Sequence, residues 1–152
     1  QALLTLDFDL VAIVRLSKVL DEGFPLFQKW IDSLNAGQII HPFADLYFAP
    51  ISTQFATHLL FQVSQQRLSG ITQASASYDV SYADVAYRLA QKLQLNPDLI
   101  QAVSCQAAGI THAPRHTTLR ADRLDALGMC PPDPWQVIDN LFPSVSPPRF
   151  QG

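Results

Sequence analysis

The sequence has 152 residues, of which 48% are hydrophobic and only 15% are charged, and its formal net charge is −3. This size and composition are typical of one packed α/β or helical domain. The acidic balance and the absence of basic runs exclude a general nucleic-acid binder. No apolar segment approaches the roughly 18 residues of a membrane span, so we expect a cytoplasmic protein with no membrane contact.

The cysteine and histidine pattern does not predict a metal centre. Cys105 and Cys130 are the only cysteines, and neither belongs to a CxxC motif or a Cys/His cluster. This usage indicates a reducing compartment and no bound metal. His112 and His116 have the four-residue spacing of two ligands on a helix, but Pro114 between them argues against a regular helix.

The stretch from Asp9 to Leu20 organises the rest of the chain. It opens with Leu10–Val14, an unbroken apolar run that predicts a strand buried on both faces of a parallel sheet. Polar side chains then begin at Arg15, Ser17 and Lys18. Because ligands gather beyond the carboxyl ends of parallel strands, these residues either border a ligand site or form a solvated loop.

Apolar side chains at helical spacing, with suitable capping residues at their ends, predict several helices. The predicted helices run from Pro25 to Gly37, from Ser52 or Thr53 to Gln66, from the capping box Ser81–Asp84 to Asn96, over Leu119–Leu127 to Gly128, and from Asp133 to Phe142. The aromatic residues of the first helix are expected in the core.

Strands or extended segments are predicted between these helices. Gly70–Ala76 and Ile100–Cys105 read as strands, Gln38–Phe43 as a short strand or extended piece, and Asp45–Ile51 as extended. The polar segment Gly109–Thr118 reads as a loop. The proline-rich tail, 143–152, is expected to be flexible because it lacks the apolar content to fold alone.

Familiar catalytic motifs are absent from the sequence. It contains no clustered glycines for a phosphate loop and no GxSxG motif, and Tyr87 and Lys92 are five residues apart rather than one helical turn. The best candidate for ligand chemistry is Arg115, which lies among His116, Thr117 and Thr118. A guanidinium suits bidentate recognition of phosphate, although Arg115 could equally pair with a surface carboxylate.

Five segments together resemble a known family. They are VRLSKVL (Val14–Leu20), PLFQKWIDSLNAG (Pro25–Gly37), DLYFAPIS (Asp45–Ser52), DVSYADVAYRLA (Asp79–Ala90) and APRHTTL (Ala113–Leu119). Their order and spacing resemble the C-terminal half of the sugar-nucleotide-binding proteins related to dTDP-4-dehydrorhamnose reductase, in the extended short-chain dehydrogenase/reductase superfamily. The resemblance implies an α/β fold over residues 1–142: late parallel strands of a Rossmann-like sheet plus a small α/β substrate-binding subdomain.

The resemblance implies the substrate-binding portion of an NAD(P)-dependent reductase acting on a nucleotide-linked 4-keto sugar. The alternative is a non-catalytic sugar-nucleotide- or NAD(P)-binding regulatory protein of the same superfamily. In this family a GxxGxxG loop and a Tyr-x-x-x-Lys pair lie in the N-terminal half, and neither occurs here. Because the sequence also begins at Gln1, we expect a piece of a longer protein, inactive alone and not binding NAD(P) alone. Its partners would be the nucleotide-sugar substrate and the N-terminal half of the same protein, and it could also form a homodimer.

The same resemblance assigns roles to individual positions, although it assigns no catalytic residue. It places Arg15, Ser17 and Lys18 near the nicotinamide end of the cofactor. It places five residues at the substrate: Val19, Asp45, Pro50, Arg115 and Thr118.

Overall fold

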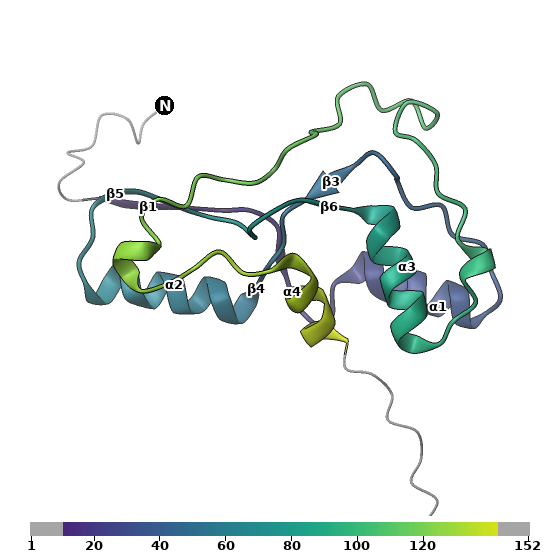
Figure 1. The fold of residues 1–152 in the computed structure, drawn as a ribbon, viewed down its shortest axis with the longest axis horizontal. Coiled ribbons are helices and arrows are strands. Elements are labelled where there is room, and N and C mark those ends of the chain that lie inside the picture. Colours follow the sequence, from purple (N-terminus) through teal and green to yellow (C-terminus); the bar gives the residue numbers. More distant parts are fainter. Residues whose placement is uncertain (1–10, 143–152) are drawn as a thin grey trace, which may run out of the picture.

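A computed structural model describes residues 11–142 of the chain. It is an elongated α/β structure in which α2 lies at one end and α1 and α3 lie at the other (Figure 1). Three short strand pairs connect the two ends, two of them parallel and one antiparallel. The predicted α/β class with parallel strands is therefore confirmed. Gln1–Leu10 and the tail 143–152, with the predictions made for them, lie outside the described residues.

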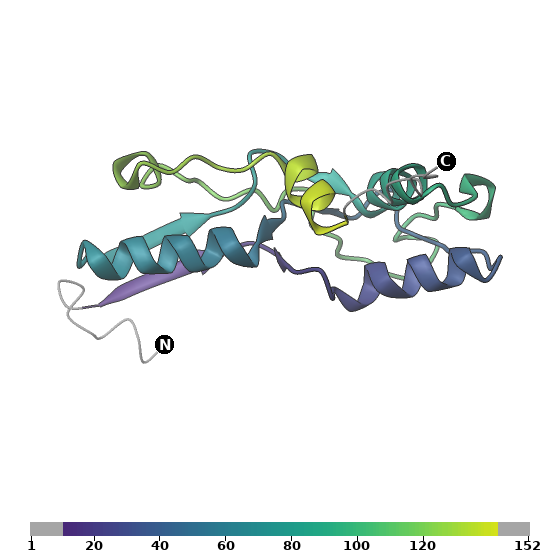
Figure 2. The same cartoon turned by 90° about the horizontal axis from the view of Figure 1, so that it is seen from below.

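The longest strand pair consists of β1 (Ala12–Leu16) and β5 (Gly70–Ala74), which run parallel with Val14 opposite Thr72. The connection between them contains α2 (Thr53–Gln65), as parallel pairing requires a crossover. In the view from below, α2 lies in front of both strands (Figure 2). Its Leu59 and Val63 pack against Val14 and Ala74, so one face of the pair is buried.

The prediction that the first strand is buried on both faces is wrong for the described chain. β1 begins at Ala12 rather than Leu10 and includes Arg15, and both Ala12 and Arg15 are exposed. The reason is that β1 has a single strand partner, β5, among residues 11–142, and α2 covers only one face. β1 therefore has more apolar surface than the other residues of 11–142 cover.

Two shorter pairs lie at the centre of the molecule. β2 (Val19–Leu20) runs parallel to β4 (Ile51–Ser52), and β3 (Tyr47–Phe48) runs antiparallel to β6 (Val80–Ser81). β4 leads directly into α2, whose first turn is capped by Ser52: its hydroxyl accepts a hydrogen bond from the Phe55 amide at 3.1 Å. This confirms the cap predicted at Ser52 or Thr53.

An aromatic core holds α1 (Pro25–Asn35) against α3 (Tyr82–Leu93). Phe27 is fully buried, and the rings of Phe24, Trp30, Phe48 and Phe142 lie 4.9–6.3 Å from its ring, centroid to centroid. The prediction that the aromatic residues of this helix form core is confirmed.

Local sequence signals set the ends of both helices. α1 ends before Gly37, whose φ of +69° is the left-handed conformation that favours glycine. The Gln38 amide donates to the Ser33 carbonyl there, which satisfies one of the last carbonyls of α1. α3 begins after Ser81, whose hydroxyl accepts from the Asp84 amide at 3.0 Å, as the capping box predicts.

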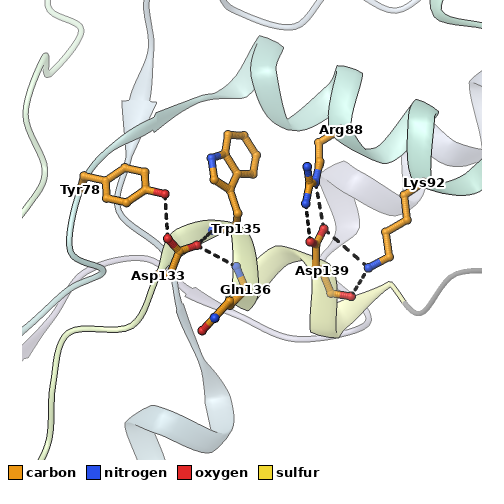
Figure 3. A network of polar contacts seen from close by, with 7 residues as sticks. All are labelled: Tyr78, Arg88, Lys92, Asp133, Trp135, Gln136 and Asp139. Atoms are coloured by element: carbon orange, nitrogen blue, oxygen red, sulfur yellow. Dashed lines mark hydrogen bonds and ion pairs between the residues drawn. The ribbon is translucent and has the colours of Figure 1, made fainter.

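The last helix, α4 (Pro134–Leu141), is joined to α3 by the polar network in Figure 3. Asp133 caps α4 by accepting from the amides of Trp135 and Gln136. At the other end of α4, Arg88 donates two hydrogen bonds to the Asp139 carboxylate, of 3.1 and 2.6 Å.

Two predicted elements are wrong. Ile100–Cys105 is not a strand: Ile100 and Val103 form only isolated bridges, to Ile40 and Phe43, and a 3₁₀ turn, η2 (Pro97–Leu99), precedes them. Of the helix predicted over Leu119–Leu127, only the 3₁₀ turn η3 (Asp125–Leu127) forms.

Hydrogen bonds to distant segments account for the missing helix. The Leu119 amide donates to the Ser75 hydroxyl, and the Arg123 guanidinium donates to the carbonyls of Ser69 and Ile71. These contacts tie the segment to β5 and its neighbours, and from Ala121 onward it forms a series of hydrogen-bonded turns rather than a helix. In residues 11–142, no helix is long and apolar enough to cross a bilayer.

Candidate functional site

An open cleft of about 690 Å³ lies where three segments that are distant in sequence meet. Its lining residues are Asp45, Tyr47, Ser77, Tyr78, Asp79, Arg115, His116 and Thr118. Three of the five residues that the resemblance places at the substrate, Asp45, Arg115 and Thr118, therefore lie in one cavity. Val19 and Pro50 do not line it.

The strand pairing explains how two of the three segments meet. In the antiparallel pair of β3 and β6, Tyr47 lies opposite Ser81 and Phe48 opposite Val80, so Tyr47 on β3 lies close to residues 77–79, which lead into β6. Tyr78 is fixed from outside the cleft, because its hydroxyl donates to Asp133 at 2.8 Å (Figure 3). This hydrogen bond joins the cleft wall to the first turn of α4.

Asp79 attaches the third segment to the other two. Its carboxylate accepts three hydrogen bonds: from the Thr117 amide at 2.9 Å, the Thr117 hydroxyl at 2.6 Å and the Thr118 hydroxyl at 2.7 Å. Burial alone would raise the pKa of Asp79, but the donors from Thr117 and Thr118 outweigh it and hold that pKa below its ordinary value. Asp79 is not predicted as a site residue from the sequence, because nothing in the residues around it links it to a residue 38 positions away.

Asp45 and Arg115 supply the charges at the centre of the site. The Cys105 amide donates to Asp45 at 2.7 Å and is the main reason that the pKa of Asp45 is lowered, with a smaller contribution from the nearby positive charge of Arg115. Arg115 is exposed, and no carboxylate lies within 4 Å of its guanidinium among the described residues. Within residues 11–142, Arg115 therefore does not pair with a surface carboxylate, which was the alternative to a ligand-binding role.

A second cavity, of about 370 Å³, shares two side chains with the first. Asp45 and Arg115 line both cavities, and the second is completed by Cys105, Gln106, Ile110, Thr111 and Ala113. Arg115, whose guanidinium is suited to bind an anion, thus borders both cavities.

The residues assigned to the cofactor do not meet in a comparable way. Arg15 lies within β1, and the Ser17 hydroxyl donates to the Ala49 carbonyl at 2.5 Å. The Lys18 ammonium lies over the rings of Phe24 and Tyr82, 5.2 and 5.5 Å from their centroids.

The two remaining assigned residues differ in exposure. Val19 on β2 is 37% exposed, whereas Pro50 is fully buried. No group of three metal-ligating side chains was found within residues 11–142.

Comparisons with known proteins give matches at the level of structure alone. No family model and no curated protein matches the sequence. A dTDP-4-dehydrorhamnose reductase from Bacillus anthracis, solved with NADP, superposes with a TM-score of 0.75 at 17% identity, over 86% of this chain and 47% of its own. A similar match, over 86% of this chain and 43% of the other, is a dTDP-glucose 4,6-dehydratase from the same organism with NAD, at a TM-score of 0.63 and 11% identity.

A third solved structure belongs to an epimerase. It is the UDP-N-acetylglucosamine 4-epimerase of Methanobrevibacter ruminantium in complex with UDP-N-acetylmuramic acid, with a TM-score of 0.62, 14% identity and coverage of 88% of this chain and 44% of its own. This chain has the fold of part of an extended short-chain dehydrogenase/reductase. It spans about half the length of the solved dehydrogenase/reductase-fold proteins that it matches.

Proposed function

We propose that this chain is the sugar-nucleotide-binding portion of an NAD(P)-dependent reductase that acts on a nucleotide-linked 4-keto sugar. The observation that carries the proposal is the meeting of Asp45, Arg115 and Thr118 in one cleft. The solved structures of the same fold support it, because three of them are a dTDP-4-dehydrorhamnose reductase, a dTDP-glucose 4,6-dehydratase and a UDP-N-acetylglucosamine 4-epimerase.

Several cleft residues have a chemical role in this proposal. The Arg115 guanidinium pairs with the diphosphate, for which its planar donors are suited. The Asp45 carboxylate, held ionised by the Cys105 amide, accepts hydrogen bonds from sugar hydroxyls. The rings of Tyr47 and Tyr78 offer apolar surface to a base or sugar ring. Thr118 donates its hydroxyl proton to Asp79, so it offers the ligand only acceptor capacity.

Within residues 11–142, the three positions that the resemblance assigns to the cofactor do not come together as a dinucleotide site. Its glycines are isolated, the Ser17 hydroxyl is bonded to Ala49, and Arg15 lies within β1 rather than in a loop. NAD(P) would supply the hydride in the whole reductase, and the residues of this chain would bind and orient the sugar nucleotide. The first partner in this proposal is the polypeptide that carries the dinucleotide-binding half.

A second candidate is a regulatory protein that binds the sugar nucleotide without reducing it. The cleft residues fit this candidate as well, because they would bind and orient a ligand and none of them is assigned a redox step. Oxidation of NADPH with a panel of 4-keto nucleotide sugars separates chemistry from binding. We expect no turnover by this chain alone, and sustained turnover would contradict the proposed division of roles.

Calorimetric titration with dTDP- and UDP-linked sugars tests the site. Arg115→Ala should weaken binding by about 1.5–3 kcal/mol, the range for hydrogen bonds to charged groups, which is about 10- to 150-fold in Kd. Arg120→Ala is the matched control, because Arg120 pairs with Asp122 on the surface and does not line the cleft. Equal affinities of the Arg115→Ala variant and the unmodified chain would remove Arg115 from the site.

A further inference from the structure

The segment that carries Arg115 has no regular secondary structure. Residues 110–121 form neither helix nor strand, and the Arg115 side chain is exposed. A guanidinium on a freely moving loop would bind an anion weakly, because the ligand would have to order both the loop and the side chain. What fixes the loop therefore bears directly on binding at the cleft.

We propose that Asp79 is a positioning residue that holds Arg115 in place for anion binding; this inference rests on the proposed function. Asp79 does so through the two residues that follow His116. Its three hydrogen bonds all come from Thr117 and Thr118, which lie two and three positions after Arg115. The Asp79 side chain is only 11% exposed, so water competes little for these bonds.

A second anchor strengthens the first. The Leu119 amide donates at 2.9 Å to the hydroxyl of Ser75, which is fully buried. Ser75 and Asp79 both belong to the connection between β5 and β6, so this connection holds residues 117–119 at successive points. The backbone immediately after Arg115 is thereby set before any ligand arrives, and ordering it adds no cost to binding.

The charge of Asp79 makes the inference testable by its sign. Its carboxylate lies in the same cleft as Arg115, where a negative charge repels a diphosphate. If Asp79 acted only through its charge, removing it would tighten anion binding. Positioning predicts the opposite result, because a loop released from Asp79 has to be ordered again by the ligand.

The experiment is a calorimetric titration of the 152-residue chain with dTDP, and with thymidine as the probe that lacks phosphate. Asp79→Ala should weaken dTDP binding by about 2- to 10-fold, corresponding to the ordering of one flexible side chain, and leave thymidine binding unchanged. In a double-mutant cycle, Asp79→Ala should have no further effect once Arg115 is Ala. Tighter dTDP binding by Asp79→Ala, or independent and additive losses, would overturn the inference.

Variants at Thr117 keep the test decisive if Asp79→Ala does not fold. Thr117→Val removes the 2.6 Å hydroxyl bond while the Asp79 charge stays, and it should weaken dTDP binding. Thr117→Ser keeps the hydroxyl and should restore binding. Wild-type affinity of Thr117→Val would overturn the inference.

The same titrations distinguish failure of the proposed function from failure of this inference. If the unmodified chain does not bind dTDP, or if Arg115→Ala binds it equally well, both fail. If Arg115→Ala weakens binding but the Asp79 and Thr117 variants do not, the inference alone fails.

Discussion

Asp139 joins the last helix to the rest of the fold, and its replacement by Asn gives a quantitative test of that connection. Arg88 on α3 donates two hydrogen bonds to its carboxylate, and the Lys92 ammonium lies 3.6 Å from the same group (Figure 3). The Lys92 bond to the Asp139 backbone carbonyl is independent of the side chain. Asp139→Asn therefore removes only the charge-assisted part of the contact.

The expected loss follows from the burial of the three side chains. Arg88 is 43% exposed, Asp139 28% and Lys92 15%. Fully exposed ion pairs contribute about 0.2–1 kcal/mol, and hydrogen bonds to charged groups about 1.5–3 kcal/mol. Solvent screening at Arg88 places this network between the two, so Asp139→Asn should lower the free energy of unfolding by about 1–1.5 kcal/mol at pH 7.

The same variant predicts a pH dependence. Hydrogen bonding to Arg88 is the main reason that the pKa of Asp139 lies below its ordinary value of 3.8. A carboxyl group with a lowered pKa in the folded state stabilises the protein above its unfolded pKa and loses this effect as the pH falls through the folded value. The difference between the unmodified chain and Asp139→Asn should therefore be full at pH 7 and shrink below about pH 4.

Urea unfolding at pH 7 and at a series of lower pH values measures both effects. Asp122→Asn is the matched control, because Asp122 pairs with Arg120 in an ion pair whose side chains are 68% and 86% exposed. The control should leave the unfolding midpoint unchanged. An equal midpoint for Asp139→Asn at pH 7, or a difference that does not depend on pH, would refute this reasoning.

Two further predictions concern the core and the surface. Phe27→Ala should lower the free energy of unfolding by about 3–5 kcal/mol in thermal or urea unfolding, whereas Phe61→Ala, at a position 58% exposed, should change it by less than about 0.5 kcal/mol. Similar effects of the two would show that Phe27 is not central to the core. The chain should also self-associate, because one face of β1 is not covered by any other part of residues 11–142 and Val19 and Ile71 are each 37% exposed. A monodisperse monomer at all concentrations in sedimentation velocity would contradict this.

Helix ends that depend on residues close in sequence could be predicted from the sequence. Ser52, Ser81 and Asp133 cap the helices predicted to follow them, and Gly37 ends α1, because each acts on backbone groups at most three residues away. The strand at Gly70–Ala74 was predicted from its composition within two residues of its end.

Secondary structure that depends on contacts between residues distant in sequence could not be predicted in this way. The helix predicted over Leu119–Leu127 is replaced by contacts of Arg123 with Ser69 and Ile71, more than 50 residues away. The same holds within the cleft. Arg115 was identified from its residue type and polar neighbours, and both Arg115 and Thr118 were identified through the resemblance. The hydrogen bonds of Asp79, however, join residues 38 and 39 positions apart, which leaves no local pattern.

Binding of a sugar nucleotide at the cleft around Arg115 can be measured from amide shifts in the NMR spectrum of the chain during titration with a dTDP-linked sugar. We expect the largest shifts in the cleft, at Asp45, Tyr47, Tyr78, Arg115 and Thr118, and we expect them to disappear in Arg115→Ala. Shifts that cluster away from these residues, or no shifts at millimolar ligand, would contradict it.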